Sequence, residues 1–123
     1  MSRSSFKVQL YPHQVAAIRF KGSIDDMLVA RAVDECLNRD STWLMIDFSE
    51  TIHANSTAIS RLLQQKDVVQ NKGGRIAFVE PTGNVGIVFD MMGLREVFTV
   101  YANLEDGLRD LIAQSSGTRK INF

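Results

Sequence analysis

The sequence has little cysteine and proline, no net charge and no long apolar run. Its single cysteine, Cys36, cannot form an internal disulfide, so the fold does not need an oxidising compartment. The 14 basic residues balance the 14 acidic ones, which removes the long-range field that attracts proteins to nucleic acid or to anionic membranes. Because no apolar run is long enough for a signal peptide or a spanning helix, we expect a cytoplasmic protein without membrane insertion.

The length and apolar content describe one domain of ordinary size. The chain has 123 residues, of which 45% are hydrophobic, and this is enough to bury a core without disulfide or metal staples. A net charge of zero gives little protection against self-association. The balance therefore favours a protein that works with partners, and it leaves a homodimer open.

The first forty residues predict a hairpin followed by a helix. Apolar and polar residues alternate over 6–10, which indicates a half-buried strand, and residues 15–20 form a second apolar segment. The short turn around Pro12 predicts that these strands pair antiparallel. Ser23 is the expected N-cap of a helix that continues to Leu37, with Cys36 on its apolar face as a core thiol.

The rest of the chain alternates strands and helices. Strands are predicted over 43–48, 75–80 and 97–101, and helices over 58–69, 85–92 and 104–112. A polar loop is expected over 49–57. The first two of these strands are almost continuously apolar, as interior strands are, and the side chains expected in the core are Trp43, Ile46, Phe48, Ile76, Phe78 and Val79.

This order of elements, β-β-α-β-α-β-α-β-α, predicts an α/β fold. Alternating strands and helices call for right-handed crossovers between parallel strands. We expect a small mixed sheet with an antiparallel edge strand and four helices. The domain is predicted over residues 1–113, and residues 114–123, which are rich in serine, glycine and basic residues, are expected to form a flexible C-terminal tail.

The order and spacing of four segments resemble the STAS domain, the family named for sulfate transporters and anti-sigma factor antagonists. The segments are a glycine-x-x-aspartate step into the first helix, a central strand, a double glycine before a strand, and a glycine-leucine step into the last strand; they occupy residues 20–25, 44–49, 72–79 and 92–101. The resemblance runs from about Phe6 to Ile112. It implies the STAS fold.

The resemblance also implies a functional loop after the central strand. The family's loop has an acidic residue, two hydroxyl residues and a glycine, and the second hydroxyl accepts a phosphate from a partner kinase. The matching residues here are Asn55, Ser56, Thr57 and Ala58, which makes Thr57 the implied phosphoacceptor and Ser56 the alternative. Two positions depart from the pattern, because Asn55 replaces the acidic residue and Ala58 replaces the glycine.

The chemistry of this loop allows two interpretations. Asn55, Ser56 and Thr57 have short oxygen-bearing side chains, and such residues often only cap a helix. A hydroxyl at a helix start beyond a buried strand also lies where α/β sheets place their functional sites. A phosphate there would add about −1.5 to −2 charges and could prevent binding without unfolding the domain.

No pattern in the sequence predicts catalysis, a metal site or a cofactor. His53 stands alone in a polar segment and is best explained as a surface residue, and no spacing of His, Cys, Asp and Glu is typical of a metal site. The glycines within 83–86 do not form a phosphate-binding loop, because the P-loop lysine and its spacing are missing. Met91 and Met92 fit either an adaptable binding surface or the core.

The function implied by the resemblance is that of an anti-sigma factor antagonist in a partner-switching circuit. Its partners would be a serine/threonine kinase of the GHKL type, which also holds a sigma factor, and a PP2C-type phosphatase, with no direct contact to nucleic acid. One alternative is a constitutive, non-phosphorylated STAS scaffold module in a lipid-transport or sensing complex. A second, a small nucleotide-handling enzyme, is disfavoured by the missing phosphate loop and acid–base groups.

Overall fold

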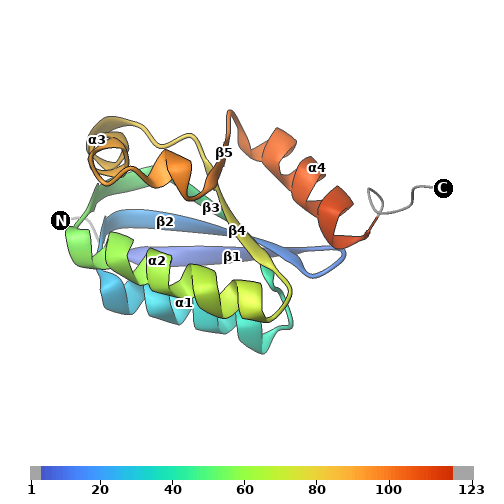
Figure 1. The fold of residues 1–123 in the computed structure, drawn as a ribbon. Coiled ribbons are helices and arrows are strands. Elements are labelled where there is room, and N and C mark those ends of the chain that lie inside the picture. The colour runs from blue at the N-terminus through green and yellow to red at the C-terminus, as the bar shows by residue number, and fades with distance from the viewer. Residues whose placement is uncertain (1–3, 118–123) are drawn as a thin grey trace.

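The computed structural model describes residues 4–117, and these form one mixed sheet covered by helices (Figure 1). The strands lie in chain order across the sheet: β1 (Ser5–Tyr11), β2 (Val15–Ile24), β3 (Trp43–Ala54), β4 (Arg75–Val79) and β5 (Thr99–Tyr101). The helical segments are α1 (Asp26–Asn38), α2 (Ser56–Asn71), α3 (Gly83–Met91), the 3-10 turn η1 (Leu94–Glu96) and α4 (Leu104–Ser115).

The pairing of the strands confirms the predicted fold class. β1 pairs antiparallel with β2 at one edge, and the remaining neighbours are parallel, as crossover helices between successive strands require. The observed order of strands and α-helices is the predicted β-β-α-β-α-β-α-β-α. The hairpin turn between β1 and β2 places His13 and Gln14 in the left-handed region, with φ of 63° and 65°.

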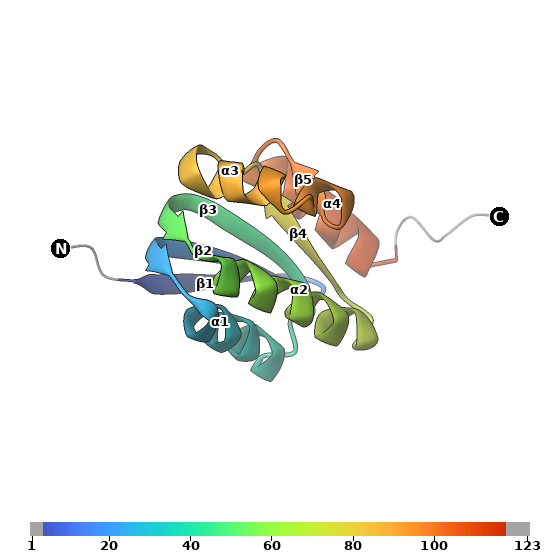
Figure 2. The same ribbon diagram turned by 60° about the vertical axis from the view of Figure 1, so that its left-hand side comes forward.

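Two apolar clusters hold the helices against the sheet. The larger cluster joins one face of the sheet to α1, α2 and α3, and a row of aromatic rings runs through it. Phe20 stacks on Phe48 at 6.0 Å between ring centroids, Phe48 stacks on Phe78 at 5.6 Å, and the edge of Phe89 from α3 meets Phe78 at 5.1 Å. The smaller cluster packs α4 on the opposite face, as Figure 2 shows.

Most of the predicted core is confirmed, with two exceptions. Ile46, Phe48, Ile76 and Phe78 are buried. Trp43 and Val79 are only partly buried, because they pack against the smaller cluster, where α4 is the single covering helix. The prediction that Trp43 and Val79 are largely buried was therefore wrong.

Several predicted element boundaries were wrong. Ser23 is not a helix cap, because β2 continues to Ile24 and Asp25 caps α1 by accepting a hydrogen bond from the amide of Leu28 at 2.9 Å. The predicted loop over 49–57 is instead the second half of β3 followed by the start of α2. The last strand is shorter than predicted, because the amides of Val97 and Phe98 donate back to the Leu94 carbonyl of η1, which leaves only Thr99–Tyr101 in β5.

The C-terminal end also differs from the expectation. The last helix, α4, extends to Ser115, two residues into the segment predicted as a tail. Residues 118–123 of that segment lie outside the described part of the chain.

Candidate functional site

The candidate site lies where β3 ends and α2 begins. Ala54, the last residue of β3, is buried, whereas Asn55, Ser56 and Thr57 are all exposed. Ala58 is again fully buried in the larger apolar cluster. The backbone is thus anchored on both sides of three exposed polar residues, at the carboxyl edge of the parallel strands. Functional sites of α/β sheets are typically found at this edge.

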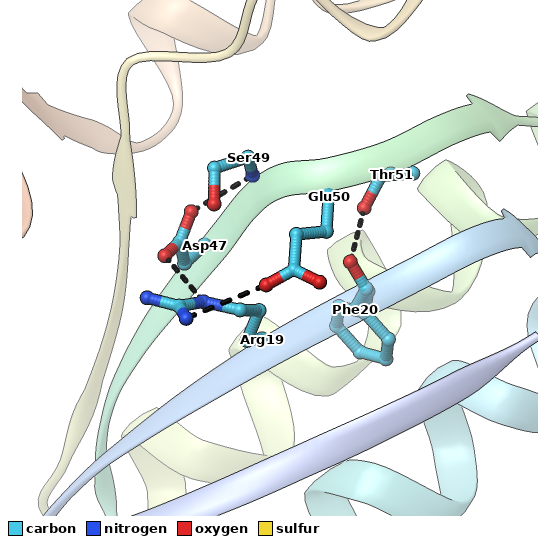
Figure 3. Close-up of polar contacts among 6 residues, drawn as sticks. All are labelled: Arg19, Phe20, Asp47, Ser49, Glu50 and Thr51. Atoms are coloured by element: carbon cyan, nitrogen blue, oxygen red, sulfur yellow. Dashed lines mark hydrogen bonds and ion pairs between the residues drawn. The ribbon is translucent and has the colours of Figure 1, made fainter.

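A polar cluster fixes the strand that leads into the site, as Figure 3 shows. The buried carboxylate of Asp47 accepts the Nε–H of Arg19 at 3.1 Å and the backbone N–H of Ser49 at 2.8 Å. Arg19 also contacts Glu50 at 3.4 Å through Nη1. Farther along the same two strands, the Thr51 hydroxyl donates to the Phe20 carbonyl at 2.8 Å. These contacts between β2 and β3 explain why a polar segment remains in the sheet.

The register of β2 and β3 shifts twice along this polar segment. Arg19 is opposite Asp47 and Lys21 is opposite Glu50, so β3 contributes one extra residue in that interval. A second extra residue follows beyond Gly22, whose φ of 84° is one that glycine adopts without strain. β-Bulges of this kind redirect a strand. Here they lie in the second half of β3, just before the chain enters α2.

Asn55 organises the site itself. Its side-chain oxygen Oδ1 accepts the backbone N–H of Ala58 at 2.8 Å, which makes Asn55 the N-cap of α2. The same Oδ1 accepts the hydroxyl of Thr57 at 2.7 Å. The hydrogen bond to Asn55 therefore orients the Thr57 hydroxyl. The lone pairs of the Thr57 oxygen point away from the donated proton.

The two hydroxyls of the site differ. The structure gives Thr57 a defined partner, whereas the hydroxyl of Ser56 has none among the described residues. Neither hydroxyl caps α2, because the cap is the Asn55 side chain. Helix capping therefore accounts for the polar side chain of Asn55, but it does not account for the hydroxyls of Ser56 and Thr57.

An arginine that was missed in the sequence lies beside Thr57. Arg61, one helical turn along α2, shares with Thr57 a shallow pocket of about 200 Å³ that Ser60, Gln64 and Asp26 of α1 complete. Arg61 donates through Nη1 to Gln64 at 3.2 Å, and its Nη2 lies 3.8 Å from the Asp26 carboxylate. The sequence signal that could have identified Arg61 was its spacing of four residues from Thr57, because residues i and i+4 are neighbours on a helix.

The other candidate residues do not join this site. His53 is exposed near the end of β3, opposite Ser23, in agreement with its interpretation as a surface residue. Cys36 is fully buried in α1, and burial raises the pKa of its thiol to about 12. The burial of Cys36 confirms the predicted core thiol. A thiol with so high a pKa is almost wholly protonated at neutral pH.

An apolar patch lies on α3 and the turn that follows it. Ile87 and Met91 stand four residues apart on one face of α3, with 59% and 81% of their surfaces exposed, and Met92 and Val97 in the segment that follows are also exposed. Arg95 steadies this region by an ion pair with Glu80 after β4 and another with Asp90 on α3 at 2.7 Å. Met91 and Met92 are therefore exposed surface residues and not core residues.

Metal-binding clusters and membrane-spanning helices are absent from the described residues. Within residues 4–117 no three His, Cys, Asp or Glu side chains come close enough to hold a metal ion. Among the described helices, none has both the length and the apolar character that crossing a bilayer requires.

Comparison with known proteins places the chain in a family. The model of the STAS domain matches residues 11–107, so the chain belongs to the STAS family. No curated protein sequence matches this chain. The family model thus confirms the resemblance drawn from the four sequence segments.

Solved structures share the fold at low identity. A Thermotoga maritima protein assigned as an anti-sigma factor antagonist is 15% identical, with a TM-score of 0.76 over 86% of this chain and 93% of that one. An anti-sigma factor antagonist from Mycobacterium paratuberculosis is 20% identical, with a TM-score of 0.71 over 89% and 94%. The phosphorylated form of the Bacillus cell fate determinant SpoIIAA is 17% identical, with a TM-score of 0.66 over 86% and 98%.

Proposed function

We propose that this chain is an anti-sigma factor antagonist that works by phosphorylation-controlled protein binding in a partner-switching circuit. Its partner is a serine/threonine kinase of the GHKL type that also holds a sigma factor. The kinase transfers the γ-phosphoryl group of ATP to the Thr57 oxygen, which releases ADP and the hydroxyl proton. A PP2C-type phosphatase restores the hydroxyl by hydrolysis. The exchange takes place in the cytoplasm.

One observation carries this proposal: the hydroxyl of Thr57 is exposed and oriented at the N-terminus of α2, although α2 does not need it as a cap. The Thr57 hydroxyl donates its proton to Asn55 Oδ1, and the Thr57 side chain is exposed. Its oxygen is therefore accessible to the phosphoryl group that a kinase delivers. Membership of the STAS family supports the assignment, and SpoIIAA has this fold in both its unphosphorylated and phosphorylated forms.

The physical effect of the modification follows from its position. A phosphate adds about −1.5 to −2 charges at neutral pH. The free amides at the start of α2 favour an anion, so the domain itself tolerates the group. A protein partner that covers the start of α2 must desolvate that charge or oppose it. One hydroxyl therefore switches binding while the fold stays intact.

The partner surface combines the start of α2 with the apolar patch on α3. Both helices follow parallel strands, β3 and β4, so both begin at the carboxyl edge of the sheet (Figure 2). The exposed methionines can adapt to a partner's shape, and buried apolar area at the centre of an interface usually dominates its affinity. In this arrangement the patch supplies affinity and Thr57 supplies control.

The alternative function is a constitutive, non-phosphorylated STAS scaffold in a lipid-transport or sensing complex. The observation that favours it is the replacement of the family's acidic residue by Asn55. A carboxamide accepts the Thr57 proton by hydrogen bonding but cannot take it up as a base. Ala58, whose methyl is buried in place of the family's glycine, also makes this loop differ from the usual pattern.

Labelling with the cognate kinase distinguishes the two functions. The protein is incubated with the kinase and ATP, and the labelled peptide is mapped by mass spectrometry. We expect the label on Thr57 in the native protein, none in Thr57→Ala, and full labelling in the matched control Ser56→Ala. Thr57→Ala removes one exposed hydrogen bond, at a cost of about 0.5–1.5 kcal/mol. Label on Ser56 alone contradicts the residue assignment, and binding without any label supports the scaffold.

A further inference from the structure

The guanidinium group of Arg61 is poorly satisfied beside Thr57. Of its donors, one nitrogen contacts Gln64 at 3.2 Å, and another lies 3.8 Å from the Asp26 carboxylate, which is beyond hydrogen-bond distance. The third nitrogen, Nε, is buried and has no hydrogen-bond partner among residues 4–117. An arginine offers five N–H donors in a fixed fork, so Arg61 has donors to spare.

We propose that Arg61 is the phosphate-receiving residue of this domain: it binds the phosphate monoester of phosphorylated Thr57. The inference rests on the proposed function for the origin of that phosphate. Thr57 and Arg61 stand at i and i+4 on α2 and line the same pocket of about 200 Å³. An anionic residue placed N-terminal to a cationic one at this spacing is the favourable orientation on a helix. Charge-assisted bonds between arginine and phosphate are short and can be bidentate.

The same geometry discriminates between the two hydroxyls. Ser56 precedes Arg61 by five residues, so its side chain leaves the α2 surface in a different direction from those of Thr57 and Arg61. Ser56 also does not line the pocket that contains Arg61. A phosphate on Ser56 would therefore gain less from Arg61 than one on Thr57.

Phosphate binding would also change the contact between α1 and α2. Asp26, in the first turn of α1, faces Arg61 at 3.8 Å, and both side chains are partly exposed. A phosphate dianion on Thr57 competes with this single carboxylate for Arg61 and adds negative charge near it. The modification thus replaces a loose ion pair between two helices by a tighter one within α2. A partner protein that binds the start of α1 would therefore respond to the loss of the Asp26–Arg61 ion pair without contacting Thr57.

The first test measures how strongly Arg61 stabilises the phosphate dianion. Phosphothreonine is incorporated at position 57 of the full chain by genetic encoding, and its second pKa is followed by ³¹P NMR. That pKa is ordinarily about 6. We expect Arg61→Gln to raise it by roughly half a unit to one unit, because the cation that favours the dianion is lost. The matched control Lys66→Gln removes an equal charge farther along α2 and should leave it unchanged.

The second test needs no substitution. The Nε–H resonance of Arg61 is compared between the unmodified protein and the protein that carries phosphothreonine 57. We expect a downfield shift on phosphorylation and a smaller one when phosphoserine is placed at position 56. Equal phosphate pKa values in Arg61→Gln and Lys66→Gln, or an unmoved Nε–H resonance, would overturn the proposal. Because the phosphate is installed without a kinase, these results are independent of whether a kinase recognises the native chain.

Discussion

At the scale of single residues, Asn55 sets the properties of the site. Its carboxamide oxygen accepts both the Ala58 amide and the Thr57 hydroxyl, so one acceptor couples the helix cap to the proposed phosphoacceptor. An aspartate would keep both hydrogen bonds and add a full negative charge next to the hydroxyl. The charge at a helix N-terminus is stabilising, and a carboxylate accepts the hydroxyl proton more strongly.

We therefore expect Asn55→Asp to raise the rate of Thr57 phosphorylation. It should also increase the free energy of unfolding by about 0.3–1 kcal/mol through the helix dipole. The matched control is Asn103→Asp, because Asn103 caps α4 in the same way, accepting the amide of Asp106 at 2.9 Å. Initial labelling rates and urea titrations of both variants check the prediction. A labelling rate that rises equally in both variants would show that the carboxylate next to Thr57 has no specific effect.

The buried thiol of Cys36 gives a second prediction for a single residue. Burial raises its pKa to about 12, so the thiolate that reacts with disulfide reagents is scarce at pH 8. We expect the folded protein to react with dithiobis(nitrobenzoate) no faster than it unfolds, and the urea-unfolded protein to react at once. Absorbance of the released thionitrobenzoate measures both rates. Rapid, stoichiometric reaction of the folded protein would place Cys36 outside the core.

At the scale of elements, β3 is the structural centre of the molecule. Its first half carries Leu44, Ile46 and Phe48 into the larger apolar cluster, and its second half leads to the site. Ile46 is fully buried between β2 and β4. We expect Ile46→Ala to lower the free energy of unfolding by about 2–5 kcal/mol, because it leaves a cavity in a close-packed core. A loss under about 0.5 kcal/mol in a denaturant titration is incompatible with a central buried strand.

The elements also show what the sequence could and could not predict. Strands and helices with strong apolar periodicity were found, because burial of one face leaves a local pattern. The second half of β3 was predicted as a loop, because its polar residues are retained in the sheet by distant partners, such as Arg19 for Glu50 and the Phe20 carbonyl for Thr51. Contacts of this kind are long-range in the sequence and leave no local pattern.

The site was predicted to a similar extent. The position of Asn55 to Ala58 after the central strand was available from the resemblance to the family. The separate roles of these residues could not be predicted, because only the structure shows that Asn55 caps α2 and that the hydroxyls of Ser56 and Thr57 do not. The pairing of Arg61 with Asp26 joins two different helices and so depends on their packing. The spacing of Arg61 from Thr57 was visible, but it gained a meaning only when both were seen in one pocket.

At the scale of the whole molecule, the proposed function is recognition without catalysis. Many polar side chains of the described residues serve in helix caps, ion pairs and contacts between strands, such as Asn55 at the start of α2 and Arg19 with Asp47. We expect the purified chain to hydrolyse neither ATP nor GTP above background in a phosphate-release assay. Sustained turnover that is abolished by Thr57→Ala or Arg61→Gln would support the enzyme alternative instead.

The most direct measurement titrates the cognate anti-sigma kinase with two forms of the protein in a calorimeter, one unmodified and one phosphorylated on Thr57. Thr57→Ala serves as the control that removes the hydroxyl without adding charge. We predict that the unmodified protein and Thr57→Ala bind with similar affinity, and that the phosphorylated form binds at least about tenfold more weakly, a difference of about 1.4 kcal/mol. Equal affinity of the phosphorylated and unmodified forms would contradict the switch at Thr57.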